Sequence, residues 1–344
     1  MLKSSRALPV PPSKRLNEMQ VFYKLVAAVA ALIACSAPNL AVAAALPVTI
    51  KHGYGETVID KPAERVVTWG WSSTEASIAL GVIPVGFPSF RSEGFEQDVV
   101  PWVAEALAEA GAEAPFILDN AAGPPIEQIA ALKPDLILAV YSGITEDEYK
   151  LLSQIAPVVP FPEEPWTASW QQVITIAGEA LGRPEEGMAL VARLEQFVRD
   201  EAARYPELAG TSAVTLIDYD GALAIHSADD ARAKMLALAG MIIPPRPEAA
   251  GPAEGFWYPM SYENADQIPA DVLIAFFSTT EAADAFFAIP TIAAAPQVRR
   301  GAVVRMDDRL LNTGVISSSA LSIEWAMPQY FERIAEAARK AKAN

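Results

Sequence analysis

Two series of alternating strands and helices fill most of this chain, and a long helical stretch separates them. In the first series, apolar runs such as RVVTWG (65–70) and DLILAVY (135–141) alternate with helical segments such as TEASIALG (74–81). This alternation is typical of parallel sheets joined by right-handed crossovers. The same order returns with AVTLIDYD (213–220) and continues to the end of the chain. The sequence therefore predicts an α/β fold with two lobes.

The stretch between the two series predicts one long helix. Pro184 stands at a position where helices commonly begin. Apolar residues recur at helical spacing after it: Met188, Val191, Leu194, Phe197 and Val198. A helix over residues 185–205 would be about 30 Å long, roughly the diameter of a small domain. We expect an N-terminal lobe at 46–183, an interdomain helix at 184–208 and a C-terminal lobe at 209–344.

One sixteen-residue pattern occurs once in each series. EQIAALKPDLILAVYS (127–142) and ENADQIPADVLIAFFS (263–278) both open with an acid, carry an Asp eight positions later, and end in an aromatic residue and Ser. Each window predicts a helix, a turn and a buried strand. Chance similarity between two α/β lobes is one explanation, but it does not explain why the acid and the Asp have the same spacing in both windows.

Charge and rare residue types exclude several kinds of protein. The net charge is −16, and the basic residues do not cluster after residue 45, so a nucleic-acid-binding role is not expected. Two His and one Cys are too few for a His-rich or Cys-rich metal site or an iron–sulfur cluster. The glycine-rich dinucleotide and phosphate loops are missing from the sequence. We expect no cofactor.

The stretch GWSST (70–74) is the nearest approach to a catalytic motif. It resembles a nucleophile elbow but ends in Thr where that motif has Gly. Ser72 with His226 as its base would make the chain an exported serine hydrolase. A single His beside a strand is more often an ordinary strand-end residue, so we expect a binding protein and not an enzyme.

The first 45 residues are typical of an export signal. Lys24 precedes the apolar run 25–34, which is too short to span a bilayer, and Met19 is an alternative start. Cys35 ends this run in the order LIAC, which fits a lipidation site. Cleavage after residues 41–43 would instead remove Cys35. Both alternatives place the protein outside the cytoplasm, either soluble or anchored through a lipid.

The stretches PAERVVTWGWSSTEASIALGVIPVG (62–86) and PIEQIAALKPDLILAVYSG (125–143), followed by the long helix, resemble the substrate-binding proteins of bacterial iron–siderophore ABC importers. The resemblance covers about residues 48–341, and that family also contains cobalamin- and haem-binding proteins. It implies two Rossmann-like lobes joined by a single long rigid helix, with the ligand between them. It further implies a monomeric periplasmic protein that delivers a ferric siderophore to an inner-membrane ABC permease with its ATPase. The siderophore, and not the protein, would hold the iron.

Aromatic and Arg residues follow several predicted strands, where ligands of open α/β sheets bind. Aromatic rings form a rigid apolar wall, and the Arg fork suits the oxygens around ferric iron. We expect the ligand to contact Trp71, Arg91, Tyr141, Arg232, Trp257 and Tyr258, with Arg309 as a further loop Arg.

Some of these residues have a structural alternative. Arg232 could pair with Asp229 or Asp230, and one ring of Trp257–Tyr258 could face the core. The acidic chain favours a neutral or cationic hydroxamate or mixed-type complex over a strongly anionic catecholate. Haem is the alternative ligand that would need a Tyr or His, such as Tyr141, Tyr258 or His226, and cobalamin is another alternative.

The resemblance also gives the repeated window a function. In similar proteins one surface Glu on each lobe meets Arg residues on the two permease subunits. Glu127 and Glu263 stand where the family places these acids, and one acid per lobe matches a two-fold receptor. The alternative is that each Glu favours an early helical turn, near the positive end of the helix dipole.

Overall fold

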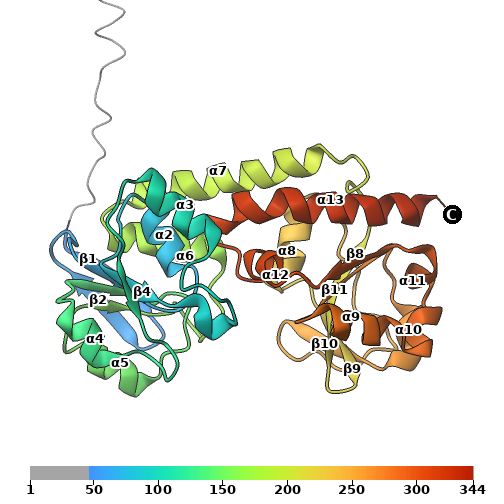
Figure 1. The fold of residues 1–344 in the computed structure, drawn as a ribbon, viewed down its shortest axis with the longest axis horizontal. Helices are drawn as coiled ribbons and strands as arrows, with labels where there is room; N and C mark the ends of the chain where they lie inside the picture. The colour runs from blue at the N-terminus through green and yellow to red at the C-terminus, as the bar shows by residue number, and fades with distance from the viewer. Residues whose placement is uncertain (1–45, 344) are drawn as a thin grey trace, which may run out of the picture. The chain divides into compact units, whose positions relative to one another are not determined.

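The computed structural model describes residues 46–343, which lie within one compact unit, Ala44–Asn344. It contains two five-stranded sheets, each covered by helices, which confirms the predicted α/β fold with two lobes (Figure 1). The predicted export signal and Cys35 lie outside the described residues.

The first lobe is built on a parallel sheet with the strand order β5-β4-β3-β6-β7. Its central strands are buried at every residue, as expected for a parallel sheet covered by helices on both faces. The strands are β3 (Val66–Thr68), β4 (Gly86–Pro88), β5 (Phe116–Leu118), β6 (Leu136–Leu138) and β7 (Val158–Val159), with a separate hairpin of β1 (Val48–His52) and β2 (Gly55–Ile59). The helices are α2 (Ser73–Ala79), η1 (Phe90–Glu93), α3 (Pro101–Glu109), α4 (Ile126–Ala131), α5 (Glu146–Leu152) and α6 (Trp170–Ala180).

The second lobe has a mixed sheet with the order β10-β9-β8-β11-β12. Strand β9 is antiparallel to both of its neighbours because a tight hairpin at Asp220–Gly221, both with positive φ (50° and 75°), reverses the chain. The strands are β8 (Ala213–Tyr219), β9 (Ala222–His226), β10 (Trp257–Met260), β11 (Val272–Phe276) and β12 (Val303–Met306). The helices are α8 (Ala231–Leu238), η2 (Tyr262–Gln267), α9 (Thr280–Phe287), α10 (Pro290–Ala294), α11 (Pro296–Arg300), α12 (Arg309–Ile316) and α13 (Ser322–Lys342).

Helix α7 (Pro184–Ala203) connects the lobes as the sequence predicts, and it begins at Pro184. Most of the predicted apolar stripe faces the core: Leu194 and Val198 are buried, and Val191 and Phe197 pack against the core cluster. Met188 departs from the prediction, since it is 58% exposed, and Leu190 and Ala202 are buried in addition.

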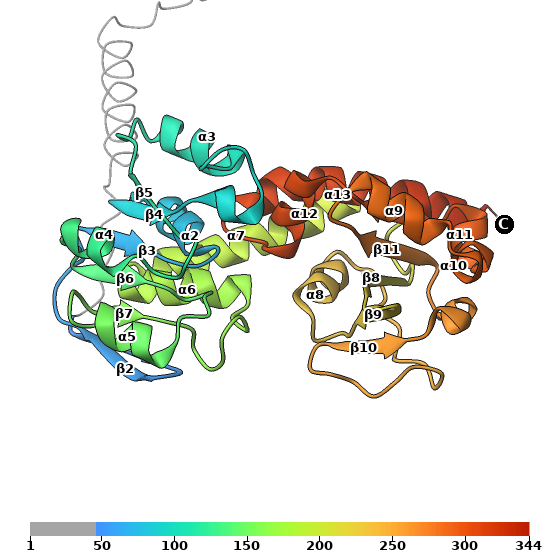
Figure 2. The same ribbon diagram turned by 60° about the horizontal axis from the view of Figure 1, so that its bottom comes forward.

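A second long helix, α13, lies beside α7 (Figures 1 and 2). Arg193 of α7 pairs with Glu324 of α13 at 2.6 Å, and the Trp325 ring of α13 lies 5.1 Å from the Trp102 ring of α3 in the first lobe. Helix α13 belongs to the second lobe in sequence, but its first turns also contact the first lobe. Among the described helices, α7 is thus the one that connects the lobes, and α13 packs along it.

One continuous group of buried apolar residues extends through both lobes. It includes Leu136 of β6, Leu194 of α7, Ile274 of β11 and Tyr330 of α13. Bending the connection between the lobes would therefore disturb close-packed side chains as well as helical hydrogen bonds.

Candidate functional site

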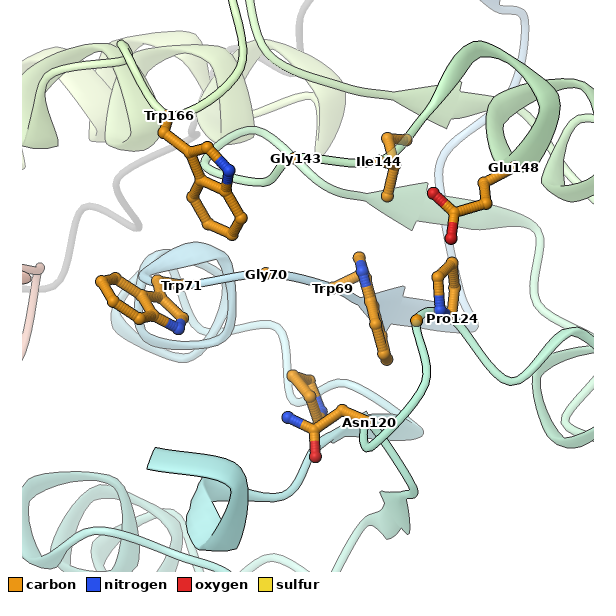
Figure 3. A pocket seen from close by; sticks show the side chains of 11 residues that line it. Trp69, Gly70, Trp71, Asn120, Pro124, Gly143, Ile144, Glu148 and Trp166 are labelled. Carbon is orange, nitrogen blue, oxygen red and sulfur yellow. The ribbon is translucent and has the colours of Figure 1, made fainter. Parts of the chain in front are cut away.

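The rings of Trp71, Tyr141 and Trp166 meet at the carboxyl ends of the central strands of the first lobe; Figure 3 shows two of them, Trp71 and Trp166. Trp71 follows β3, and its backbone N–H donates to the carbonyl oxygen of Tyr141, which follows β6, at 2.9 Å. The Trp166 ring lies 5.7 Å from the Trp71 ring and 5.6 Å from the Tyr141 ring, nearly perpendicular to the latter. These tilted and edge-on arrangements are favourable for aromatic pairs, so the three side chains form a rigid apolar wall.

Two glycines allow this cluster to form. A Cβ at Gly70, which has φ of 77°, would come within 2.4 Å of the carbonyl oxygen of Tyr141. A Cβ at Gly143 would come within 2.3 Å of Nε1 of Trp166. Any larger residue at either position would push the rings apart, since close backbone approach is possible only for glycine.

A cavity of about 290 Å³ opens against Trp69, Trp71 and Trp166 on the first lobe (Figure 3). Asn120 and Pro124 form other parts of its wall. Of the described residues that line it, Glu148 alone is charged. That carboxylate already accepts hydrogen bonds from the backbone N–H and the hydroxyl of Thr145, at 2.7 and 2.9 Å, in a capping box at the start of α5.

A second cavity of about 300 Å³ lies on the other side of Trp71, against the second lobe. Its wall includes Phe276, Phe277, Asn312 and Arg309. Nδ2 of Asn312 donates to the carbonyl oxygens of Phe277 and Met306, both at 2.9 Å, which fixes the end of β11 against α12. Trp71 lines both cavities, so the two form one cleft between the lobes with this ring at its centre.

The structure brings Trp71 and Tyr141 together, and it places the other predicted aromatic residues elsewhere. Trp257 begins the edge strand β10, and its ring lies 5.9 Å from that of Tyr219. It lines neither of the two cavities. Tyr258 is 2% exposed in the core of the second lobe, which favours the alternative that this ring faces the core. Alternation along β10 buries Tyr258 and Met260 and leaves Trp257 half-buried.

Arg91 and Arg232 line neither of these two cavities, and each is held by a neighbouring carboxylate. Nε of Arg91 lies 2.9 Å from Asp98 at the surface. Arg232 makes a two-bond contact with Asp230 at 2.8 and 2.7 Å, and its guanidinium carbon lies 5.9 Å from the centre of the Phe276 ring. The pairing alternative for Arg232 is therefore the one observed. Arg309, the third loop Arg, is the one that lines the cleft.

The buried Arg232–Asp230 pair affects its surroundings electrostatically. Burial raises the pKa of Tyr141, while the charge of Arg232 lowers it and that of Asp230 raises it. Burial and the Arg232 charge lower the pKa of His226 from near 6.5 to about 4, against the opposing influence of Asp230 and Thr215. His226 is therefore neutral at physiological pH.

The hydrolase alternative lacks its catalytic pair. The hydroxyl of Ser72 is directed to the carbonyl oxygen of Ser317 at 3.5 Å, and Nδ1 of His226 lies 3.0 Å from Oγ1 of Thr215. Both side chains are buried with partners of their own. Within residues 46–343, no group of three or more His, Cys, Asp or Glu is arranged to hold a metal ion. None of the helices in that range combines the length and apolar character needed to cross a bilayer.

The repeated window folds in both lobes as a short helix, a turn and a strand, with an α-helix in the first lobe and a 3-10 helix in the second. Glu127 is the second residue of α4 and Glu263 the second residue of η2, and both are exposed. The Ser261 hydroxyl donates to the Glu263 carboxylate, which, with the Glu263 backbone N–H, holds the pKa of Glu263 below its usual range.

The Asp that recurs in both windows has a structural role. The backbone N–H of Asp135 donates to the carbonyl oxygen of Arg65, and the Asp135 carboxylate accepts from the N–H of Arg65 at 2.9 Å. Asp271 makes the same reciprocal pair with Ser212, at 3.1 and 2.9 Å. In each lobe the Asp therefore aligns two neighbouring parallel strands at their starting edge.

Trp69, Trp166 and Asn312 line the two cavities but are not among the site residues predicted from the sequence. Trp69 follows β3 directly, so its place at a strand end was available as a signal. Trp166 belongs to the segment before α6, and only the fold brings it to Trp71. Asn312 lies within α12, where nothing in the sequence distinguishes it from a surface amide.

The chain matches known proteins over most of its length. A family model described as "Periplasmic binding protein" matches residues 66–310. The chain is 27% identical over 209 residues to the Fe(3+) dicitrate-binding periplasmic protein FecB of Escherichia coli (strain K12), covering 60% of this chain and 65% of that protein. It is 29% identical over 192 residues to the probable siderophore-binding lipoprotein YfiY of Bacillus subtilis (strain 168), covering 54% and 55%. The matched part therefore spans less than two thirds of these two relatives.

Solved structures match a larger share. The structure of PiaA from Streptococcus pneumoniae TIGR4 in complex with ferrichrome has a TM-score of 0.74 and 29% identity, covering 86% of this chain and 100% of that chain. A periplasmic solute binding protein from Mycobacterium smegmatis str. MC2 155 has a TM-score of 0.72 and 27% identity, covering 85% and 99%.

Proposed function

Since the chain belongs to the periplasmic binding protein family, we propose that it is the substrate-binding protein of an ABC importer for a ferric siderophore. It captures the complex in the cleft centred on Trp71 and delivers it to an inner-membrane permease with its ATPase. The position of Trp71 carries this proposal, because its ring borders a cavity on each lobe. A ligand seated there would contact both lobes at once.

The lining of the cleft suits an iron chelate. The chelator surrounds the iron, so the protein meets mainly the organic periphery of the complex, for which aromatic walls are well suited. Trp69, Trp71 and Trp166 supply that wall on one side, and Phe276 and Phe277 on the other. Relatives named for Fe(3+) dicitrate, siderophores and ferrichrome support a ferric complex as the ligand class.

The charge of the cleft favours a neutral or cationic complex of the hydroxamate or mixed type. Among the described lining residues of the two cavities, Glu148 and Arg309 are the charged ones, one of each sign. A strongly anionic chelate would need several cations to offset its own charge and that of an acidic protein. Haem has less support, because His226 and Tyr258, two of its three candidate ligands, are buried within the second lobe.

Glu127 and Glu263 are proposed as the permease contacts. Each is exposed at the second position of a short helix, one in each lobe. Charged pairs across such an interface would set the orientation of the protein on a two-fold receptor. We place the protein in the periplasm, either soluble or anchored through a lipid on Cys35. The relative YfiY is named as a lipoprotein, which supports the anchored alternative.

A tryptophan-fluorescence titration with a panel of ligands tests the proposal. The panel contains ferrichrome (neutral), ferrioxamine B (cationic), ferric citrate and a ferric tris-catecholate (anionic), haem and cyanocobalamin. We expect saturable quenching at one neutral or cationic complex per chain, and at least about tenfold weaker binding of the anionic ones. The proposal fails if no ferric complex quenches at micromolar concentration, or if haem or cyanocobalamin binds best.

A further inference from the structure

A small cavity of about 10 Å³ lies beneath Trp71, between the two lobes. The first lobe lines it with Trp71, Ser72, Glu75 and Trp102, and the second lobe with Thr313 and Ser317. This volume is at the lower limit of what one water molecule requires. The hydroxyls, the carboxyl and the backbone around it supply polar partners, which a buried water also requires.

Glu75 is the one carboxyl that faces this cavity among the described residues that line it. Its side chain is 4% exposed, and Oε1 accepts a hydrogen bond from Nε1 of Trp102 at 3.3 Å. Oε2 is buried, and within the described part of the chain it has no hydrogen-bond partner. A buried carboxyl oxygen without a partner is costly, and much more so when the group is ionised.

Among the described residues packed around Glu75, no cation is placed to stabilise the ionised form. Helices α3 and α6 and strand β3 pack against α2, and the titratable residues on them are all exposed acids: Glu105, Glu109 and Glu179. On the remaining neighbours, Arg91 of η1 pairs with Asp98, Glu324 of α13 pairs with Arg193, and Arg309 of α12 lines the larger cavity. Burial raises the pKa of Glu75, and the opposing influence of its own backbone, of Trp102 and of the nearby Ser319 is smaller.

Contacts between the lobes surround the same point. Ser72, which adopts a left-handed conformation (φ 62°), directs its hydroxyl to the carbonyl oxygen of Ser317 at 3.5 Å. The ring of Trp102 packs on Trp325 of α13. The loop that carries Trp71 therefore packs, on the side of the small cavity, against Glu75 and against residues of the second lobe.

We propose that this cavity holds one water molecule shared between the protonated carboxyl of Glu75 and the second lobe, and that this contact positions Trp71 for ligand binding. The protonated carboxyl can donate to the water, which can donate in turn to the carbonyl oxygen of Ser317. Ionisation would draw more water to the carboxylate and loosen the contact between the lobes beneath Trp71. The role in ligand binding rests on the proposed function, whereas the protonated state of Glu75 does not.

Three variants separate the possible outcomes. Glu75→Gln keeps the shape and the acceptor for Trp102 but cannot ionise, Glu75→Leu removes the polar group, and Glu105→Gln on the adjoining helix is the control for loss of a surface charge. Titration of tryptophan fluorescence with ferrichrome is carried out from pH 5 to pH 9. We expect wild-type and E105Q affinity to fall as pH rises through the titration of Glu75. E75Q should keep the high-affinity value throughout, and E75L should bind about tenfold more weakly at every pH.

Thermal unfolding of the ligand-free proteins over the same pH range gives an independent readout. A carboxyl whose pKa is raised by folding loses stabilisation as pH rises above about 4.5. The wild-type melting temperature should therefore fall relative to that of E75Q as pH rises. Equal pH profiles for wild type and E75Q, in binding and in melting, would overturn the inference, as would wild-type affinity in a folded E75L. If wild type binds no ferric complex but the melting profiles diverge, the proposed function fails and the protonated Glu75 stands.

Discussion

The rings of Trp71 and Trp166 lie 5.7 Å apart at the cleft, yet the protein holds them very differently. Trp71 is half-buried and tied to Tyr141 through its backbone, whereas Trp166 is 48% exposed. In the apolar wall, Trp71 is therefore packed into the protein, whereas much of the Trp166 side chain is exposed to solvent. Trp166 is the ring that can be removed with little cost to the fold.

Replacing Trp166 by Ala should weaken ligand binding by about ten- to a hundredfold, because a large aromatic contact at a binding site contributes about 1–3 kcal/mol. The free energy of unfolding should change by less than about 1 kcal/mol. Ferrichrome titration and urea unfolding measure the two effects. Phe116→Ala is the matched control, since Phe116 is also 48% exposed but lines neither cavity. Equal affinities for the two variants would remove Trp166 from the site.

Reversing both docking acids, in Glu127→Arg with Glu263→Arg, should abolish uptake in cells that lack their own copy of the gene. Like charges would then face each other across the interface with the permease. Each single Ala variant should reduce uptake several-fold. Ligand affinity and stability of the purified variants should remain close to wild type, because exposed acids contribute little to either.

The control for the docking experiment uses two other acids that also lie in the first turn of a helix but lie outside the repeated window. Glu185 lies in the first turn of α7 and Glu281 in the first turn of α9, and both are exposed. Reversing this pair should leave uptake near normal. If the two double variants transport equally well, the repeated Glu is a feature of helix starts and not a docking residue.

Stability should fall on acidification through His226. In the folded protein its pKa is about 4, while in the unfolded chain it is near 6.5. Between these values the unfolded state binds a proton that the folded state does not, so lower pH favours unfolding. Urea unfolding at pH 7 and pH 4.5 should show a loss of about 2–3 kcal/mol from this group. His226→Gln should reduce that loss by the same amount, and an unchanged pH slope in this variant would contradict the assignment.

Ligand binding should change the arrangement of the lobes only slightly. Closure by a wide hinge would require α7 and α13 to bend and the shared core to repack, which is costly. Small-angle scattering with and without ferrichrome should give radii of gyration that agree within error. A clear decrease on binding would show that the two helices do not hold the lobes.

The sequence predicted the architecture well where pattern and backbone chemistry agree. Pro184 fixed the start of α7, and the alternation of strands and helices identified both lobes. The repeated Asp is explained by one physical task, since Asp135 and Asp271 each join a strand start to its neighbour by reciprocal hydrogen bonds. The spacing of that Asp from the preceding Glu is a property of the helix–turn–strand unit, and the role of the Glu stays a prediction.

The site was harder to predict because its residues meet only in three dimensions. Trp166 reaches Trp71 from a separate segment, and the glycine at position 143 makes room for it. Tyr258 lies on an alternating edge strand that turns its side chain into the core, a placement that the sequence did not reveal. For Arg232 the structure shows the pairing with Asp230 that the sequence left open, and a contact of Arg232 with the ligand stays a prediction.

The second long helix has a consequence for how the chain folds. Tyr330 and Phe331 of α13 belong to the same buried group as Leu136 of the first lobe and Ile274 of the second. Cutting the chain before α7 would strip the first lobe of part of this core and leave an apolar surface in water. Neither lobe is then an independent folding unit, and the two lobes should unfold together in a single cooperative transition. During synthesis, this shared core can form only after the last helix of the chain has been made.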